Sequence, residues 1–230
     1  AINFAVALNK IGRKVGILDA DIYGPSIPRM MGISGKPYSN ENKKLIPLEN
    51  YGVKCMSIGF LISVDTPAIW RGPMVMKALE QMFNGVEWGD LEYLIIDLPP
   101  GTGDAQLTLA QSSKLSGSII VSTPQDVALI DARKGINMFK KVNVPILGLV
   151  ENMSYFICDQ CNHKHFIFAN GGAKKEAENY HIPYLGELPL DKKLRIQSDE
   201  GNPTCIDDPN GKMSLIYLNI AEKIDNSLNS

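Results

Sequence analysis

The chain has 230 residues, of which 44% are hydrophobic, so it can bury a large core, and we expect one domain over residues 1–230. Its 23 basic and 25 acidic residues give a formal net charge of −2, which excludes a broad basic surface for nucleic acid and a polybasic membrane anchor. The apolar runs are far shorter than the roughly 20 residues that cross a bilayer. We therefore expect no nucleic acid and no membrane as partners.

Cysteine usage bears on the compartment. Of the four cysteines, only Cys158 and Cys161 lie close together, which is not typical of a disulfide framework. The chain also opens without the charged segment and apolar run of a secretory signal. Both features predict a reducing, cytoplasmic location, or an organelle matrix if the source is eukaryotic.

The chain opens in a helical pattern, because apolar residues recur with helical spacing over residues 1–11 and Gly12 stands at the position of a helix stop. Further along, short apolar runs alternate with amphipathic segments. The predicted strands cover residues 14–19, 53–58, 93–97, 118–122, 146–150 and 183–188. The later helices are predicted at residues 28–31, 73–83, 126–141, 172–180 and 212–226, with one more starting at about residue 104.

This alternation predicts an α/β fold with a doubly wound, mostly parallel sheet of the P-loop NTPase type. Residues 24–50, apart from the short helix, are rich in Gly, Pro, Ser and Asn and are predicted to form a surface loop. In the helix at residues 73–83, we expect the buried face to carry the following apolar side chains: Met74, Ala78, Leu79, Met82 and Phe83.

Aspartates follow two of the predicted strands, and ligands of doubly wound sheets bind beyond the carboxyl ends of strands. Asp97 precedes Leu-Pro-Pro-Gly-Thr-Gly, the arrangement of a Walker B aspartate before a switch loop with Gly101 and Gly103 as hinges. Such a carboxylate would hold Mg²⁺ directly or through water. The alternative is an Asp that caps the next helix after a plain turn.

The second strand end carries Asp19-Ala-Asp21. Here one carboxylate, which we assign as Asp21, could orient a water for in-line attack, while Asp19 supports the Mg²⁺ shell and nucleotide. Asp-rich loops after strands are common, so this motif indicates a nucleotide switch only together with Asp97 at the same sheet edge.

A phosphate-binding loop of the form Gly-x-x-x-x-Gly-Lys-Ser/Thr does not occur in the 230 residues. The nearest approaches, Gly32 to Lys36 and Gly211-Lys212, lack its spacing and its hydroxyl residue. Residues 1–11 have the pattern of a helix that such a loop begins. We therefore expect the loop and its strand to precede Ala1, and we expect these 230 residues alone to bind ATP poorly.

Cys158-Asp-Gln-Cys161 is the second group with chemical potential, in a loop predicted at about residues 152–169. Two thiolates at this spacing can hold zinc or an iron-sulfur cluster. A four-ligand site needs two more ligands, either His163 and His165 or the same cysteines of a second copy. Thioredoxin-like chemistry is disfavoured because no apolar helix begins at the pair. The remaining alternative is a loop with two inert thiols.

Five stretches resemble the Mrp/ApbC family of iron-sulfur cluster carrier ATPases, and the resemblance covers essentially the whole chain. They are ILDADIYGPSIP (17–28), WRGPM (70–74), DLPPGTGD (97–104), TPQDVALID (123–131) and ENMS (151–154), and the cysteine pair adds to them. The resemblance implies a homodimer that binds ATP and Mg²⁺, bridges a [4Fe-4S] cluster and serves apo iron-sulfur client proteins.

Residue by residue, the resemblance implies that Asp21 orients the attacking water and Asp97 holds Mg²⁺. It implies that Asn152 and the backbone near Pro189 are neighbours of the adenine. Cys158 and Cys161 would be the cluster ligands.

The leading hypothesis is therefore an ATP-dependent cluster carrier, with ATP hydrolysis assigned to the intact protein. One rival is a partition-type or cell-division ATPase of the same scaffold, which predicts a basic amphipathic tail. The last predicted helix has little positive charge, which argues against this rival. The other rival is a structural zinc site at the cysteine pair.

Overall fold

The computed structural model describes residues 1–61, 72–112 and 114–229. The chain divides into two compact units: the first unit comprises Ala1–Pro100 and Leu194–Ala221, and the second unit comprises Gly101–Lys193 and Glu222–Ser230. Trp70 and Arg71 of the WRGPM stretch lie outside the described residues. The prediction of a single domain stays a prediction.

The first unit is built on a four-stranded sheet in the order β2-β3-β1-β4. Its strands are β1 (Val15–Asp19), β2 (Leu48–Asn50), β3 (Val53–Ser57) and β4 (Tyr93–Asp97). β1 is parallel to both β3 and β4, and β2 joins β3 in antiparallel pairing. All five residues of β1 are buried, as expected for a central strand of a parallel sheet that is covered on both faces.

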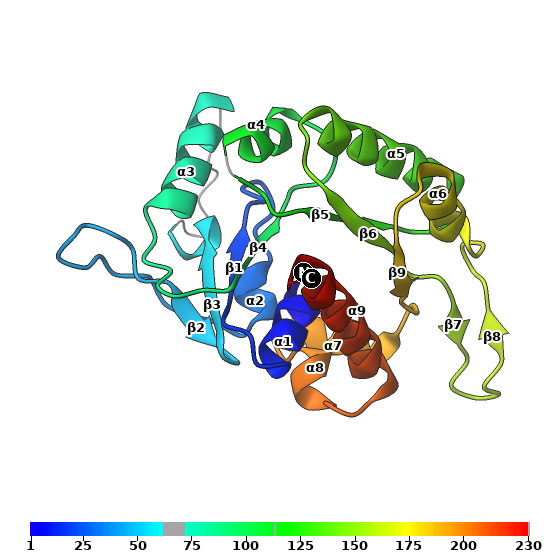
Figure 1. Cartoon of the computed structure of the whole chain (residues 1–230). Coiled ribbons are helices and arrows are strands. Elements are labelled where there is room, and N and C mark those ends of the chain that lie inside the picture. The colour runs from blue at the N-terminus through cyan, green and yellow to red at the C-terminus, as the bar shows by residue number, and fades with distance from the viewer. Residues whose placement is uncertain (62–71, 113, 230) are drawn as a thin grey trace. The chain divides into compact units, whose positions relative to one another are not determined.

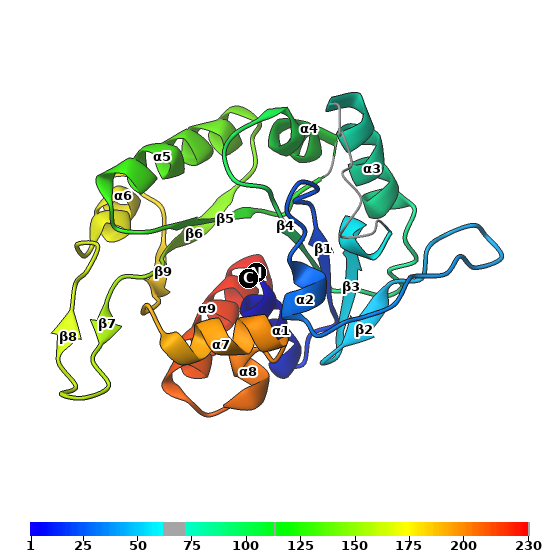
Figure 2. The ribbon, with the colours of Figure 1, turned by 180° about the vertical axis from the view of Figure 1, so that it is seen from behind.

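Helices lie on both faces of this sheet. Figures 1 and 2 show α1 (Ile2–Lys10) on one face and α3 (Gly72–Asn84) on the other. The other helical segments with residues in the first unit are α2 (Ile27–Met30), the 3₁₀ turn η1 (Ile58–Phe60), α7 (Lys192–Glu200), α8 (Thr204–Asp207) and the first part of α9 (Lys212–Asn229). This arrangement is the doubly wound one.

The second unit has a three-stranded parallel sheet in the order β5-β6-β9. Its strands are β5 (Ser118–Ser122), β6 (Ile146–Glu151) and β9 (Tyr184–Glu187). The helices are α4 (Asp104–Ser112), α5 (Asp126–Lys141), α6 (Gly172–Tyr180) and the last part of α9, and of these α5 and α6 cover one face of the sheet (Figure 1). β7 (Phe156–Ile157) and β8 (Lys164–His165) form an antiparallel hairpin between β6 and α6.

The predicted α/β fold class with mostly parallel strands is confirmed, and the predicted strands and helices occur at the expected places. Two details differ. Strand β2 lies inside the predicted surface loop, where it pairs with β3 through a tight turn at Tyr51-Gly52. On α3 the buried side chains are Val75, Leu79 and Met82, whereas Met74 is 52% exposed, so the predicted face was wrong at that position.

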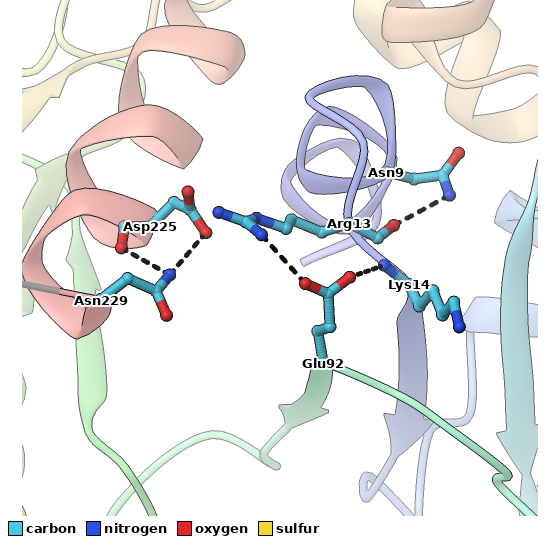
Figure 3. A network of polar contacts seen from close by, with 6 residues as sticks. All are labelled: Asn9, Arg13, Lys14, Glu92, Asp225 and Asn229. Atoms are coloured by element: carbon cyan, nitrogen blue, oxygen red, sulfur yellow. Dashed lines mark hydrogen bonds and ion pairs between the residues drawn. The ribbon is translucent and has the colours of Figure 1, made fainter.

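A polar cluster fixes the starts of β1 and β4 (Figure 3). Glu92 accepts hydrogen bonds from the guanidinium of Arg13 at 3.0 Å and from the backbone N–H of Lys14 at 2.9 Å. The Lys14 N–H is the main reason that the pKa of Glu92 lies below its usual value. Arg13 and Lys14 directly precede β1 and Glu92 directly precedes β4, so the cluster joins the starts of these two strands. No helix within the described ranges combines the length and apolarity that crossing a bilayer requires.

Candidate functional site

Asp19 and Asp97 are the last residues of β1 and β4, and they are register partners in the parallel ladder. The backbone N–H of Ala20 donates to the carbonyl of Asp97 at 2.9 Å, so the pairing continues past the strand ends. The first unit therefore brings together the two predicted strand-end carboxylates at one sheet edge, the position where ligands of such sheets bind.

Asp19 is only 1% exposed. Its carboxylate accepts hydrogen bonds from the Ser57 hydroxyl at 2.9 Å and from the Ile27 N–H at 3.2 Å. Burial raises the pKa of Asp19 to about 6, the negative charge of Asp97 acts in the same direction, and the hydrogen bonds counteract part of the rise. Two neighbouring carboxylates in a poorly solvated place suit a hard divalent cation such as Mg²⁺, which would favour their charged forms.

Asp21 lies in the loop directly after β1. Its Oδ1 accepts hydrogen bonds from the backbone N–H groups of Tyr23 at 3.2 Å and Gly24 at 3.1 Å, which closes an Asx turn. Asp21 also donates its own N–H to Asp19 at 3.3 Å. The loop thus holds the Asp21 side chain in one orientation beside the carboxylate edge.

The predicted hinge glycines, Gly101 and Gly103, begin the second unit and are exposed. Gly101 has φ +93°, a left-handed conformation that other residues adopt only with strain. A Cβ on Gly103 would approach the side-chain oxygen of Gln106 to 3.2 Å. The geometry agrees with a requirement for glycine at position 101 more strongly than at position 103.

Ser57 is a site residue that the sequence reasoning missed. It is fully buried at the end of β3, next to β1, and its hydroxyl donates to Asp19. A signal was available, because a strand-terminal hydroxyl on the strand adjacent to an aspartate points to the same sheet edge.

Asn152 and Pro189 lie close together in the second unit. Asn152 follows β6 and donates its N–H to the Ser122 carbonyl at 2.7 Å. Just beyond it, the N–H of Ser154 donates to the carbonyl of Leu188 at 2.9 Å, so the chain after β6 runs beside the chain after β9. Both predicted adenine neighbours thus stand at the carboxyl edge of this sheet.

Glu151, the last residue of β6, is a second missed residue. Its carboxylate is fully buried and accepts hydrogen bonds from the Ser154 hydroxyl at 2.5 Å and from the N–H groups of Gly171 at 2.9 Å and Ala173 at 2.8 Å. These N–H groups belong to the start of α6, where the helix dipole also favours a negative charge. Glu151 therefore fixes the start of α6 to the segment that contains Asn152.

Cys158 and Cys161 lie in the turn of the β7-β8 hairpin, and neither forms a disulfide. The turn is closed by hydrogen bonds from the Cys158 N–H to the His163 carbonyl at 3.0 Å and from the Asn162 N–H to the Cys158 carbonyl at 2.9 Å. Hydrogen bonding by the backbone N–H of Cys161, and next by that of Gln160, lowers the pKa of the Cys158 thiol. A thiolate is the form that binds metal.

His163 and His165 do not complete a metal site with the two cysteines. Their rings contact each other edge to face, with centroids 4.7 Å apart. In the part of the chain that the structure describes, no three His, Cys, Asp or Glu side chains come together as a metal-binding group. One described chain therefore presents the two cysteine thiols and not the four-ligand set with both histidines.

The chain is similar to known proteins over nearly its whole length. Over residues 1–225 the chain matches the model of a family described as "ParA: NUBPL iron-transfer P-loop NTPase". It is 56% identical over 225 residues to the "Iron-sulfur protein required for NADH dehydrogenase, mitochondrial" of Arabidopsis thaliana, which covers 97% of this chain and 72% of that protein. It is 52% identical to the "Iron-sulfur cluster carrier protein" of Escherichia coli (strain K12), covering 97% of this chain and 61% of that protein.

The chain is also similar to solved structures. A nucleotide-binding protein from Archaeoglobus fulgidus in complex with ADP superposes with a TM-score of 0.78 at 38% identity, covering 92% of this chain and 82% of that chain. The septum site-determining protein MinD of Pyrococcus horikoshii OT3 with Mg-ADP superposes with a TM-score of 0.73 at 20% identity, covering 98% and 88%. At that identity the likeness to MinD shows the fold alone.

Proposed function

Because the chain belongs to the ParA-type family of NUBPL iron-transfer P-loop NTPases, we propose that it is an ATP-dependent carrier that holds a [4Fe-4S] cluster and passes it to apo-proteins. The relatives named above extend beyond the part that this chain covers, which is 72% of one and 61% of the other. We therefore assign the activity to the whole protein, including any residues that precede Ala1.

The observation that carries the proposal is the exposed cysteine hairpin, by which we mean residues 156–165. It presents two free thiols, and the pKa of Cys158 is lowered, so that thiolate is available to bind iron. A [4Fe-4S] cluster takes four thiolate ligands, and one described chain presents two in this turn. The proposal therefore includes a homodimer in which the hairpins of two copies share one cluster.

The carboxylate edge of the first unit supports the nucleotide part of the proposal. Asp97 and the buried Asp19 would hold Mg²⁺, and Asp21 would orient the attacking water. Gly101 would let the loop after Asp97 respond to the γ-phosphate, and Asn152 with Pro189 would border the adenine. In this scheme hydrolysis changes the state of the carrier, and the cluster is cargo that is transferred unchanged.

Anaerobic cluster reconstitution of the whole protein tests the proposal. Cys158→Ala with Cys161→Ala should abolish the visible absorbance and the bound iron of the parent. Cys205→Ala is the matched control, because Cys205 is a buried thiol remote in sequence from the pair, and this variant should bind as much iron as the parent. If the double variant retains the parent's iron and absorbance, the cysteine hairpin is not the carrier site.

A further inference from the structure

The cysteine hairpin has little structure of its own. Its strands β7 and β8 have two residues each, and every residue from Asp159 to Ile167 is exposed. A hairpin of this size is marginal in water unless it packs on something larger. Its orientation therefore depends on the few contacts that attach its base to the rest of the second unit.

These contacts converge on two segments. At the backbone, the Leu190 N–H donates to the Tyr155 carbonyl at 2.7 Å, and Phe156 forms an isolated parallel bridge with Leu190. Leu190 directly follows Pro189, and Tyr155 lies three residues after Asn152. The hairpin is thus attached to the same two backbone segments that carry the predicted adenine neighbours.

One side-chain contact ties the hairpin to the same place. The Lys164 ammonium, in β8, lies 3.3 Å from Oε1 of Glu187, the last residue of β9. It also lies 3.7 Å from the centre of the Tyr155 ring, a cation–π contact. Lys164 pairs with Ile157 across the hairpin, so it is next to the cysteine turn in the ladder.

The second oxygen of Glu187 continues the connection. Oε2 lies 3.2 Å from the Ser154 hydroxyl, which donates to Glu151 at 2.5 Å. Glu187 and Glu151 are register partners on β9 and β6. Glu187 therefore lies between Lys164 of the hairpin and Ser154 of the segment that we call the Asn152 turn, residues 152–154.

We infer that Glu187 is a positioning residue that couples the Asn152 turn to the cysteine hairpin, so that nucleotide bound at this turn changes how firmly the hairpin is held. The inference rests on the proposed function, because that proposal places the nucleotide beside Asn152 and Pro189. It assigns the coupling to one ion pair, Lys164 with Glu187, together with the Ser154 contact. In the carrier, this coupling would make retention of the cluster depend on the nucleotide state.

The test is amide hydrogen exchange of the cluster-free whole protein with and without MgADP. In the parent, MgADP should change exchange at the hydrogen-bonded amides of Cys158 and Asn162 by about twofold to fivefold, the range that an exposed ion pair can transmit. Glu187→Gln should abolish this response and change MgADP affinity by no more than the same twofold to fivefold factor, because coupling between two sites is reciprocal. Lys164→Gln should do the same, and the double variant should add nothing, as expected for partners in one interaction.

The matched control is Glu87→Gln, which breaks the exposed Lys44–Glu87 pair of similar exposure, 46% and 42% against 42% and 38%. This control should keep the parent's response. A response that persists in Glu187→Gln, one that Lys164→Gln leaves intact, or a parent without any response would each overturn the inference. No cluster is present in this experiment, so none of these outcomes affects the cysteine reconstitution test. A failed reconstitution, in turn, leaves the exchange result valid.

Discussion

The carboxylate edge of the first unit and the cysteine hairpin of the second unit hold their functional groups in opposite ways. Asp19 is 1% exposed, and its oxygens are fixed by Ser57 and by backbone N–H groups. Cys161, in contrast, is exposed in a short hairpin. The difference matches the proposed tasks, because a phosphoryl-transfer site gains from groups that are already in place, whereas cargo must be reached by a client.

The largest expected effect is the difference in thiol reactivity between the buried cysteines and the cysteine hairpin. Burial raises the pKa of Cys55 to about 12 and that of Cys205 to about 11, while the pKa of Cys158 is lowered. At neutral pH the buried thiols should therefore carry about a hundredfold to a thousandfold less thiolate than an ordinary cysteine, and they are shielded as well. Thiol labelling of the native apo-protein, followed by peptide mass spectrometry, should modify Cys158 and Cys161 first. Equal labelling of all four cysteines would contradict the predicted difference in reactivity between the buried thiols and the hairpin thiols.

Asp21 tests whether the ordered loop beside the carboxylate edge serves catalysis. Asp21→Asn should lower ATP turnover of the whole protein by about a hundredfold or more, the usual contribution of a group that handles the proton of the nucleophile. ADP binding should change little. Asp90→Asn, at an exposed aspartate of the same unit, is the control and should keep the parent's turnover. Parental turnover in Asp21→Asn would remove Asp21 from the mechanism.

Glu151 shows that the second unit also has a rigid part, at the base of the hairpin. Glu151→Ala should lower the free energy of unfolding by about 3 kcal/mol, because it leaves the buried N–H of Ala173 and the half-buried N–H of Gly171 without their acceptor. Urea denaturation measures this loss. Glu222→Ala, at an exposed site of α9, should cost less than about 0.5 kcal/mol. A similar small cost for Glu151→Ala would show that the buried carboxylate is not stabilising.

Asp19 predicts a pH dependence with a definite sign. Its pKa is about 6 in the folded chain and about 3.9 in the unfolded chain, so the folded state binds more protons between these values. Stability without Mg²⁺ should therefore fall by about 2 kcal/mol as pH rises from about 4 to about 7 through this group. Asp19→Asn should reduce that slope, and Asp90→Asn should not. Identical slopes in the parent and Asp19→Asn would contradict the burial argument.

Much of this framework could be predicted from the sequence, because most helices and strands are long enough for their periodicity to show. Helix α5 begins and ends at the predicted residues, and β4 does so too. The phase of a helix is harder to predict. On α3 both Met74 and Val75 fit a helical stripe, and packing against the sheet selects Val75.

The missed site residues depend on partners far away in the chain. Ser57 meets Asp19 across 38 positions, and Glu151 meets Ala173 across 22. A strand-terminal serine or glutamate looks like an ordinary surface residue until those partners are known. The β7-β8 hairpin was not predicted because two-residue strands are too short to show a period of two. The roles of Asp19, Asp21, Asp97 and the cysteines stay predictions.

Native mass spectrometry of the anaerobically reconstituted whole protein tests the central claim most directly. Since one described chain offers two cysteine ligands in the hairpin turn, the cluster-loaded species should have the mass of two chains with a single [4Fe-4S] cluster. It should dissociate to apo single chains when the cluster is removed. A single chain that carries a complete cluster, or one that carries only zinc, would contradict the account.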